Sequence, residues 1–105
     1  MSSELKITEV KHRFNTEVLL SGEVDIYTSQ MLKEKLYGIL DDTKQDMLIN
    51  CEGLTYIDST GLGIFVGVLK KAKQYGKGIR ISKLKENIKK LFLITGLDKL
   101  FVILD

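Results

Sequence analysis

The sequence predicts an α/β domain in which helices pack against a mixed central β-sheet. After residue 22, short apolar runs with strand character alternate with segments whose apolar residues recur at helical spacing, and the connections between them are short. Such alternation favours a partly parallel sheet with right-handed crossovers. The 105 residues, 44% of them hydrophobic and 29% charged, suit one hydrophobic core, so we expect a single domain over 1–105.

The first expected element is a β-hairpin. Strand-forming residues dominate Leu5 to Val10 and Glu17 to Ser21, and Phe14-Asn15-Thr16 between them suits the connection. The single histidine, His12, falls close to this connection. We therefore expect His12 to be a surface residue of the hairpin.

A helix is expected next, over residues 28–40. Its apolar residues form one stripe, made of Leu32, Leu36, Ile39 and Leu40. Either Asp25 or Thr28 is suited to cap its start. A polar loop over 41–46 then leads to Met47–Cys51, a nearly continuous apolar run that is typical of a strand buried on both faces.

The junction after this strand carries the most informative polar residues. The apolar residues that follow it recur at helical spacing: Leu62, Phe65, Val66, Leu69 and Ala72. Asp58, Ser59 and Thr60 are all favourable caps, so the helix should begin at or beside Ser59, with its hydroxyl near unpaired N–H groups. A helix N-terminus also tolerates an anion such as phosphate.

Spacing alone leaves two interpretations of Ser59. It is either an ordinary helix cap or a residue that is modified or binds a partner.

Further elements complete the predicted domain. The helix should end near Gly76 and Gly78, and a short strand should follow over 79–82. Helical spacing returns over 86–95, with Gly96 as a stop signal. The last apolar segment, Phe101 to Leu104, either closes the sheet or packs across it.

Three glycines follow Ser59, but their spacing excludes nucleotide-binding loops. Gly61, Gly63 and Gly67 do not fit G-x-G-x-x-G, because Val66 occupies the third position, and the Gly-Lys-Ser/Thr of a P-loop is absent. Each glycine costs about 1 kcal/mol of helix propensity relative to alanine, which indicates close approach of the helix to the sheet or to a partner. Gly61 and Gly63 would also leave the Ser59 hydroxyl open.

Enzymatic and metal-binding functions find no support in the sequence. The G-x-S-x-G element of serine hydrolases is missing, and one cysteine and one histidine cannot build a closed zinc site. We therefore expect no catalytic residue, no cofactor and no metal. Cys51, in an apolar run, is expected to be buried and unreactive. Asp25 and Asp58 would form a carboxylate pair only if the fold brings them together.

The net charge of +2 conceals an asymmetry along the chain. Residues 1–69 carry 6 basic and 11 acidic side chains, a net charge of −5, whereas residues 70–105 carry 10 basic and 3 acidic ones, a net charge of +7. A basic C-terminal third could meet nucleic acid or an acidic partner. Because no nucleic-acid-binding signature accompanies these lysines, we favour the interpretation that they solvate the outer faces of helices.

The sequence also indicates where the protein resides. No apolar run reaches the roughly 18–20 residues that span a bilayer. The first residues lack the basic start and apolar core of a secretory signal. We therefore expect a cytoplasmic protein.

Three segments resemble the STAS-domain family and, within it, the bacterial anti-sigma factor antagonists. They are GEVD at 22–25, YIDSTGLG at 56–63 and LITGLDKLF at 93–101. The D-S-T-G-L-G element is the most specific of them, and the resemblance spans nearly the whole chain. One departure is Asn50-Cys51, where many relatives have Asp-Leu or a similar pair at the end of the strand. We expect this departure to affect packing or partner choice more than phosphorylation.

The resemblance implies a non-enzymatic partner-switching protein. Unphosphorylated, such a protein binds a cognate anti-sigma factor that is also an ATP-binding serine kinase, and so releases the sigma factor; phosphorylation reverses this, and a serine phosphatase restores binding. By position, Ser59 matches the phosphoacceptor and Asp25 and Asp58 match acidic residues close to it. Thr60 and Gly61 match the contact surface. The alternative is a STAS scaffold or ligand-sensing subunit of a larger signalling assembly.

Overall fold

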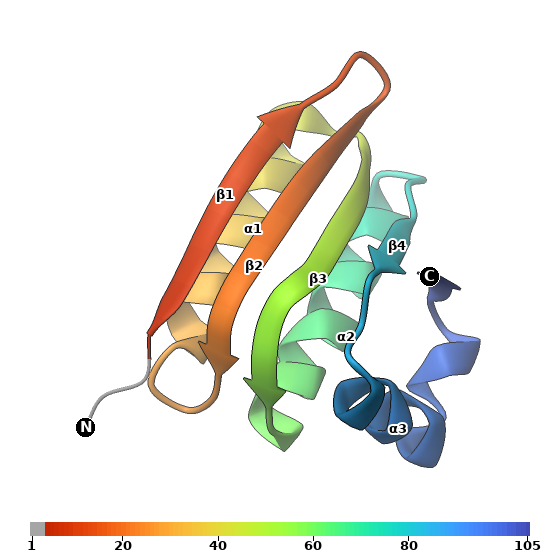
Figure 1. Ribbon diagram of the computed structural model, residues 1–105. Helices are drawn as coiled ribbons and strands as arrows, with labels where there is room; N and C mark the ends of the chain where they lie inside the picture. The colour runs from red at the N-terminus through yellow and green to blue at the C-terminus, as the bar shows by residue number, and fades with distance from the viewer. Residues whose placement is uncertain (1–3) are drawn as a thin grey trace.

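A computed structural model describes residues 4–105 and shows a five-stranded mixed sheet with the strand order β1-β2-β3-β4-β5 (Figure 1). The strands are β1 (Leu5–Lys11), β2 (Asn15–Val24), β3 (Asp46–Ile57), β4 (Ile79–Ser82) and β5 (Val102–Leu104). The helices are α1 (Ser29–Thr43), α2 (Ser59–Gln74), α3 (Glu86–Thr95) and the 3-10 helix η1 (Leu97–Lys99). β1 and β2 are antiparallel, and the other neighbouring strands are parallel. The predicted fold class is confirmed.

The predicted N-terminal hairpin is confirmed. β1 and β2 pair along the whole length of β1. Asn15 and Thr16, which were expected in the connection, already belong to β2, and β2 continues past its predicted end as far as Val24, because its other edge pairs with β3. His12 lies in the connection with half of its side chain exposed and its Nε2 3.4 Å from Glu17 Oε1, as expected for a surface residue.

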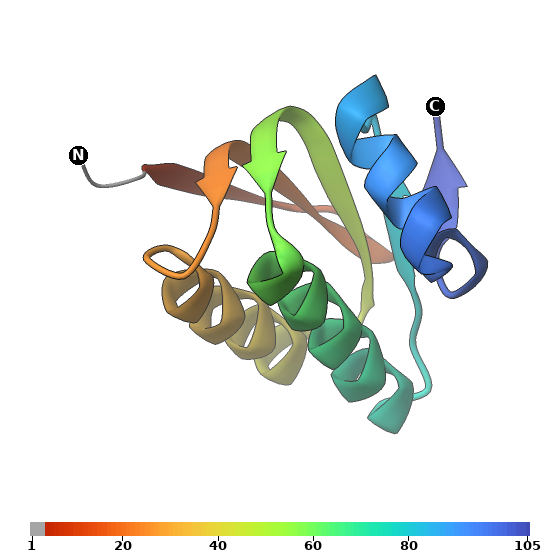
Figure 2. The ribbon, with the colours of Figure 1, turned by 90° about the horizontal axis from the view of Figure 1, so that it is seen from below.

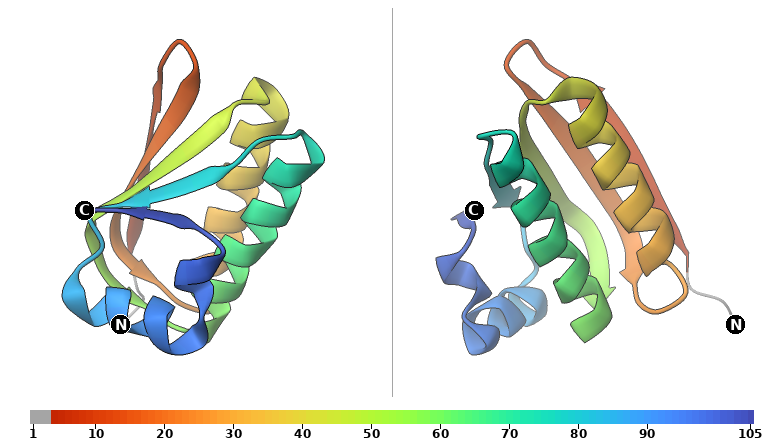
Figure 3. Two further views of the ribbon diagram at one scale, coloured as in Figure 1. Left: turned by 90° about the vertical axis from the view of Figure 1, so that its right-hand side faces the viewer. Right: turned by 180° about the vertical axis from the view of Figure 1, so that it is seen from behind.

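β3 is longer than predicted and is buried on one face only. Burial alternates along its first half, where Met47, Ile49 and Cys51 are buried while Leu48 and Asn50 are only partly buried. The expectation of a strand buried on both faces is therefore wrong. Figures 2 and 3 show the reason: α1 and α2 lie side by side on one face of the sheet, so side chains that point the other way meet little protein.

The core fills the space between this face of the sheet and the two long helices. α1 buries the four predicted apolar residues, and it ends later than predicted, at Thr43. α2 buries Leu62, Phe65, Leu69 and Ala72 as predicted. Val66 is only partly buried and Val68 is buried instead. The helical periodicity therefore predicted the buried faces with one error.

α3 joins the core through aromatic rings. Phe65 of α2, Phe92 of α3 and Phe101 meet edge to face, with ring centroids 6.0 to 6.4 Å apart. α3 has the predicted bounds and ends at Gly96 in the left-handed region, with a φ of 77°. The last segment joins the sheet, because β5 pairs in parallel with β4.

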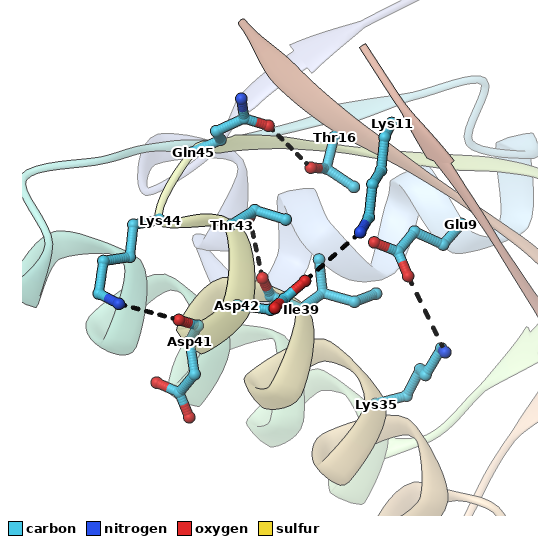
Figure 4. Close-up of polar contacts among 10 residues, drawn as sticks. All are labelled: Glu9, Lys11, Thr16, Lys35, Ile39, Asp41, Asp42, Thr43, Lys44 and Gln45. Carbon is cyan, nitrogen blue, oxygen red and sulfur yellow. Dashed lines mark hydrogen bonds and ion pairs between the residues drawn. The ribbon is translucent and has the colours of Figure 1, made fainter. Parts of the chain in front are cut away.

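Polar contacts hold the end of α1 against the hairpin (Figure 4). The buried Thr16 hydroxyl donates to Gln45 Oε1 at 3.1 Å, and Gln45 Nε2 donates to the Arg13 carbonyl at 3.1 Å. Lys11 lies 3.4 Å from Asp42 on the surface. These contacts link the segment before β3 to the hairpin, and so help to set the position of α1 over the sheet.

Two of the three α2 glycines lie in close contact with neighbouring side chains. A Cβ at Gly61 would come within 2.6 Å of Ile57 and Val24, and one at Gly67 within 2.7 Å of the Tyr37 hydroxyl. A Cβ at Gly63 would meet no atom within 4 Å. The predicted close approach to the sheet is therefore confirmed at Gly61, which lets α2 begin directly against the ends of β2 and β3, whereas Gly67 lies against Tyr37 of the neighbouring helix α1.

This difference predicts opposite effects of alanine at two positions in one helix. Gly61→Ala should lower the free energy of unfolding by about 1–3 kcal/mol, because the new methyl group overpacks the contact with the sheet. Gly63→Ala should raise it by about 0.5–1 kcal/mol through helix propensity alone. Urea unfolding of both variants measures this, and equal effects at the two positions would contradict the packing argument.

Candidate functional site

The N-terminus of α2 is capped by Asp58. The backbone of Asp58 is extended, and its Oδ1 accepts a hydrogen bond of 3.1 Å from the Gly61 N–H. Ser59 is the first helical residue, is exposed, and makes no side-chain hydrogen bond within residues 4–105. The interpretation of Ser59 as the helix cap is therefore wrong, and its hydroxyl faces solvent.

Asp25 orders the connection between β2 and α1. Its Oδ1 accepts hydrogen bonds from the backbone N–H groups of Tyr27, at 2.8 Å, and Thr28, at 3.2 Å. The buried Thr28 hydroxyl donates to the Glu23 carbonyl at 2.8 Å. Thr28 is the residue before α1 but makes no side-chain cap bond, so its hydroxyl holds the loop instead. Asp25 is thereby fixed in a short, well-defined turn.

Strand pairing brings Asp25 and Asp58 to adjacent positions. Val24 and Ile57 are register partners in the parallel pair of β2 and β3, and the Asp58 N–H donates to the Val24 carbonyl at 3.2 Å. Each aspartate directly follows one of these residues, so both lie at the carboxyl ends of neighbouring strands (Figure 2). The fold therefore provides the proximity that the sequence left open.

The remaining predicted site residues lie at the same edge with different exposure. Thr60 is exposed beside Ser59, whereas Gly61 is buried against Ile57 and Val24. Gly61 accordingly has a packing role in the structure. Its part in a contact surface, like that of Thr60, stays a prediction.

The start of α2 is electrostatically suited to an anion. Unpaired N–H groups at the start of α2 give this end partial positive charge, which tolerates a phosphate on Ser59. Burial raises the pKa of the Cys51 thiol to about 12, so the thiol stays protonated at neutral pH. Within residues 4–105, no three His, Cys, Asp or Glu side chains gather closely enough to hold a metal ion. None of the described helices has the length and apolarity to cross a membrane.

Several lysines of the basic C-terminal third are paired with carboxylates. Asp41 accepts hydrogen bonds from the Tyr75 hydroxyl and from Lys71, whose Nζ is 3.0 Å away. The Tyr75 bond, followed by Lys71, lowers the pKa of the Asp41 carboxyl. Two further ion pairs are Lys83 with Glu52 and Lys89 with Asp105. Three basic side chains of residues 70–105 therefore lie in ion pairs at the surface of the described part of the chain.

The site agrees with the family resemblance of the sequence. It has an exposed serine directly after a capping aspartate, at the junction of β3 and α2 in a mixed five-stranded sheet. Residues 6–105 match the model of the STAS domain, and the chain belongs to this family. A relative from Staphylococcus aureus (strain NCTC 8325 / PS 47), named anti-sigma-B factor antagonist, is 44% identical over 84 residues, which cover 80% of this chain and 78% of the relative.

Solved structures share the fold. An anti-sigma factor antagonist from Mycobacterium paratuberculosis has a TM-score of 0.86 at 22% identity, covering 96% of this chain and 86% of that one. The Bacillus cell fate determinant SpoIIAA in its phosphorylated form has a TM-score of 0.69 at 18% identity, covering 97% and 90%. SpoIIAA in its unphosphorylated form has a TM-score of 0.71 at 17% identity, covering 99% and 88%. The same fold therefore occurs in both phosphorylation states of SpoIIAA.

One feature near the site was not interpreted from the sequence. Helical spacing grouped Ile88, Leu91, Phe92 and Thr95 on one face of α3. Ile88 and Phe92 are buried as predicted, whereas Leu91 is only partly buried and Thr95, in the last turn, is exposed. The same helix exposes Leu93 and Ile94. The sequence pattern that could have predicted this exposure is the position of the two apolar residues in the last turn. They lie three and four residues after the exposed Lys90 and therefore share its side of the helix.

The capping bond predicts a specific stability difference at Asp58. Asp58→Ala should lower the free energy of unfolding by about 1 kcal/mol, because the Gly61 N–H loses its acceptor. Asp58→Asn keeps an acceptor oxygen and is an equally favourable cap, so it should cost less than half as much. Urea unfolding compares the two, and equal losses would show that the cap bond contributes little.

Proposed function

We propose that this chain is an anti-sigma factor antagonist that acts by partner switching. The identity to an anti-sigma-B factor antagonist over most of both chains supports this proposal. Unphosphorylated, the chain binds an anti-sigma factor that is also an ATP-binding serine kinase, and the sigma factor is released. The kinase phosphorylates Ser59 and thereby loses its hold on the chain, and a separate serine phosphatase restores the binding form.

The single structural observation that carries this proposal is the exposed Ser59 hydroxyl at the start of α2. Its neighbour Asp58 supplies the cap bond, so Ser59 is not needed to complete the helix. Thr60 is also exposed, but it lies about 100° further round the helix, and the family resemblance matches Ser59 to the phosphoacceptor. Ser59 is therefore the hydroxyl that we assign as phosphoacceptor.

Phosphorylation would act through charge at this edge. A phosphoserine adds about −1.5 to −2 charges at neutral pH. That charge would arise directly beside Asp58 and near Asp25, so three acidic groups would share one small surface. The helix N-terminus offsets about 0.3–1 kcal/mol of the cost within the domain. A partner surface that fits the neutral hydroxyl has no such compensation, so its binding is weakened.

The proposal has four further parts. Residues 1–105 form a single STAS domain with a regulatory function and no catalysis of its own. The protein acts in the cytoplasm, where sigma factors meet RNA polymerase. It needs no cofactor. Neither nucleic acid nor a membrane is a partner, and the ion pairs of the C-terminal lysines support the first of these exclusions.

Incubation with the anti-sigma factor encoded in the same genome, in the presence of ATP, should add one phosphate per chain at Ser59. Mass spectrometry of the intact and digested protein locates it. Ser59→Ala should abolish the modification. Thr60→Ala, which removes the neighbouring hydroxyl, is the matched control and should be phosphorylated on Ser59 at a rate comparable to that of the natural chain. Phosphate that persists in the Ser59→Ala protein would exclude Ser59 as the acceptor.

A further inference from the structure

The last turn of α3 is apolar on the side that faces solvent. Leu93 has 55% of its surface exposed, and Ile94 has 80%. Ile88 and Phe92, which anchor α3 in the core, are buried on the other side of the helix. An exposed apolar pair on a rigid helix is typical of an interaction surface when charged groups border it. We call Leu93, Ile94 and Lys90 the α3 patch.

The charge of the α3 patch indicates the chemistry of its partner. Lys90 lies three and four residues before Leu93 and Ile94, so it borders both of them on the helix. It is exposed and forms no ion pair within residues 4–105, and the same holds for Lys99 in η1. A partner that carries carboxylates around an apolar recess would complement this surface. Two copies of this chain would instead oppose lysine to lysine, which argues against self-association here.

The position of the α3 patch connects it with the proposed phosphorylation site. Figure 2 shows three segments next to one another across one end of the molecule: first the loop after β2, then the start of α2, and then helix α3. Phe65 of α2 contacts Phe92 of α3 with ring centroids 6.0 Å apart, so the two helices are packed together. A partner seated over Ser59 can therefore reach α3 without any rearrangement of the domain.

We propose that the kinase that phosphorylates Ser59 also docks on the α3 patch, with Leu93 and Ile94 in an apolar recess and Lys90 against a carboxylate. This inference rests on the proposed function and adds a second contact outside the phosphoacceptor. The two contacts have different effects. The α3 patch determines which kinase binds, because phosphorylation of Ser59 does not change the shape or charge of the patch. The contact at Ser59 makes the affinity depend on the phosphorylation state.

The test measures the affinity of the purified anti-sigma factor encoded in the same genome for unphosphorylated variants, by isothermal titration calorimetry. Ile94→Ser and Lys90→Glu should each weaken binding about tenfold. The controls are Phe14→Ser, which removes a side chain that is 76% exposed in the hairpin connection, and Lys77→Glu, which reverses an exposed cation beyond the end of α2. Both controls lie at the opposite end of the molecule and should leave the affinity within about twofold.

Two outcomes separate this inference from the proposed function. If the natural chain is bound and phosphorylated on Ser59, but Ile94→Ser and Lys90→Glu bind as tightly as the controls, the α3 docking contact is wrong and the function stands. If the natural chain is neither bound nor phosphorylated, both fail together. Because Ile94 and Lys90 are exposed, the urea unfolding midpoints of all four variants should match the natural chain, which confirms that a loss of affinity reflects the contact.

Discussion

The parallel pairing of β2 with β3 is the constraint on which the candidate site depends. It places Val24 opposite Ile57, and the hydrogen bond from the Asp58 N–H to the Val24 carbonyl fixes the two strand ends together. Both functional segments leave the sheet from this point: the Asp25 turn leads into α1, and Ser59 begins α2. A shift of one residue in this register would move the alternating side chains to the opposite face and separate the two aspartates.

If Ser59 is phosphorylated as proposed, the two aspartates would keep the site in one geometry in both charge states. Asp25 and Asp58 each accept backbone N–H hydrogen bonds in a turn or a cap, so neither carboxylate is free to swing away from a neighbouring phosphate without breaking those bonds. The fold would therefore hold the added negative charge at a fixed place. Regulation by local charge needs no second conformation of the domain, and a penalty of about 1.4 kcal/mol already changes affinity tenfold.

Local patterns in the sequence predicted the elements whose signals are local. The hairpin, α3 and the stop at Gly96 followed from periodicity and turn residues, and the buried stripe of α2 was wrong only at Val66. The length of β3 did not follow, because residues 52–57 extend the strand through their pairing with β2 and not through a continuous apolar run. Burial on both faces of β3 was predicted and is absent for a different reason, because α1 and α2 both cover the same face of the sheet.

The site was predictable in composition and less so in geometry. Three consecutive residues at the junction were suitable caps, and the choice of Asp58 depends on the extended backbone that the strand pairing imposes on it. The proximity of Asp25 to Asp58 depends on strand order, which spacing does not contain. Resemblance to a family identified Ser59, Asp25 and Asp58, whereas the exposed apolar residues of α3 were visible in the sequence but were interpreted only once their exposure was known.

The central claim is that a phosphate on Ser59 blocks the partner by local charge while the domain keeps its fold. The most direct measurement compares the dissociation constants of the anti-sigma factor for the unphosphorylated and the Ser59-phosphorylated chain, with the amide NMR spectra of both forms recorded alongside. The account predicts an affinity loss on the order of 100-fold, with spectral changes confined to residues around the start of α2 and the Asp25 turn. Equal affinities for the two forms, or spectral changes across the whole sheet, would contradict it.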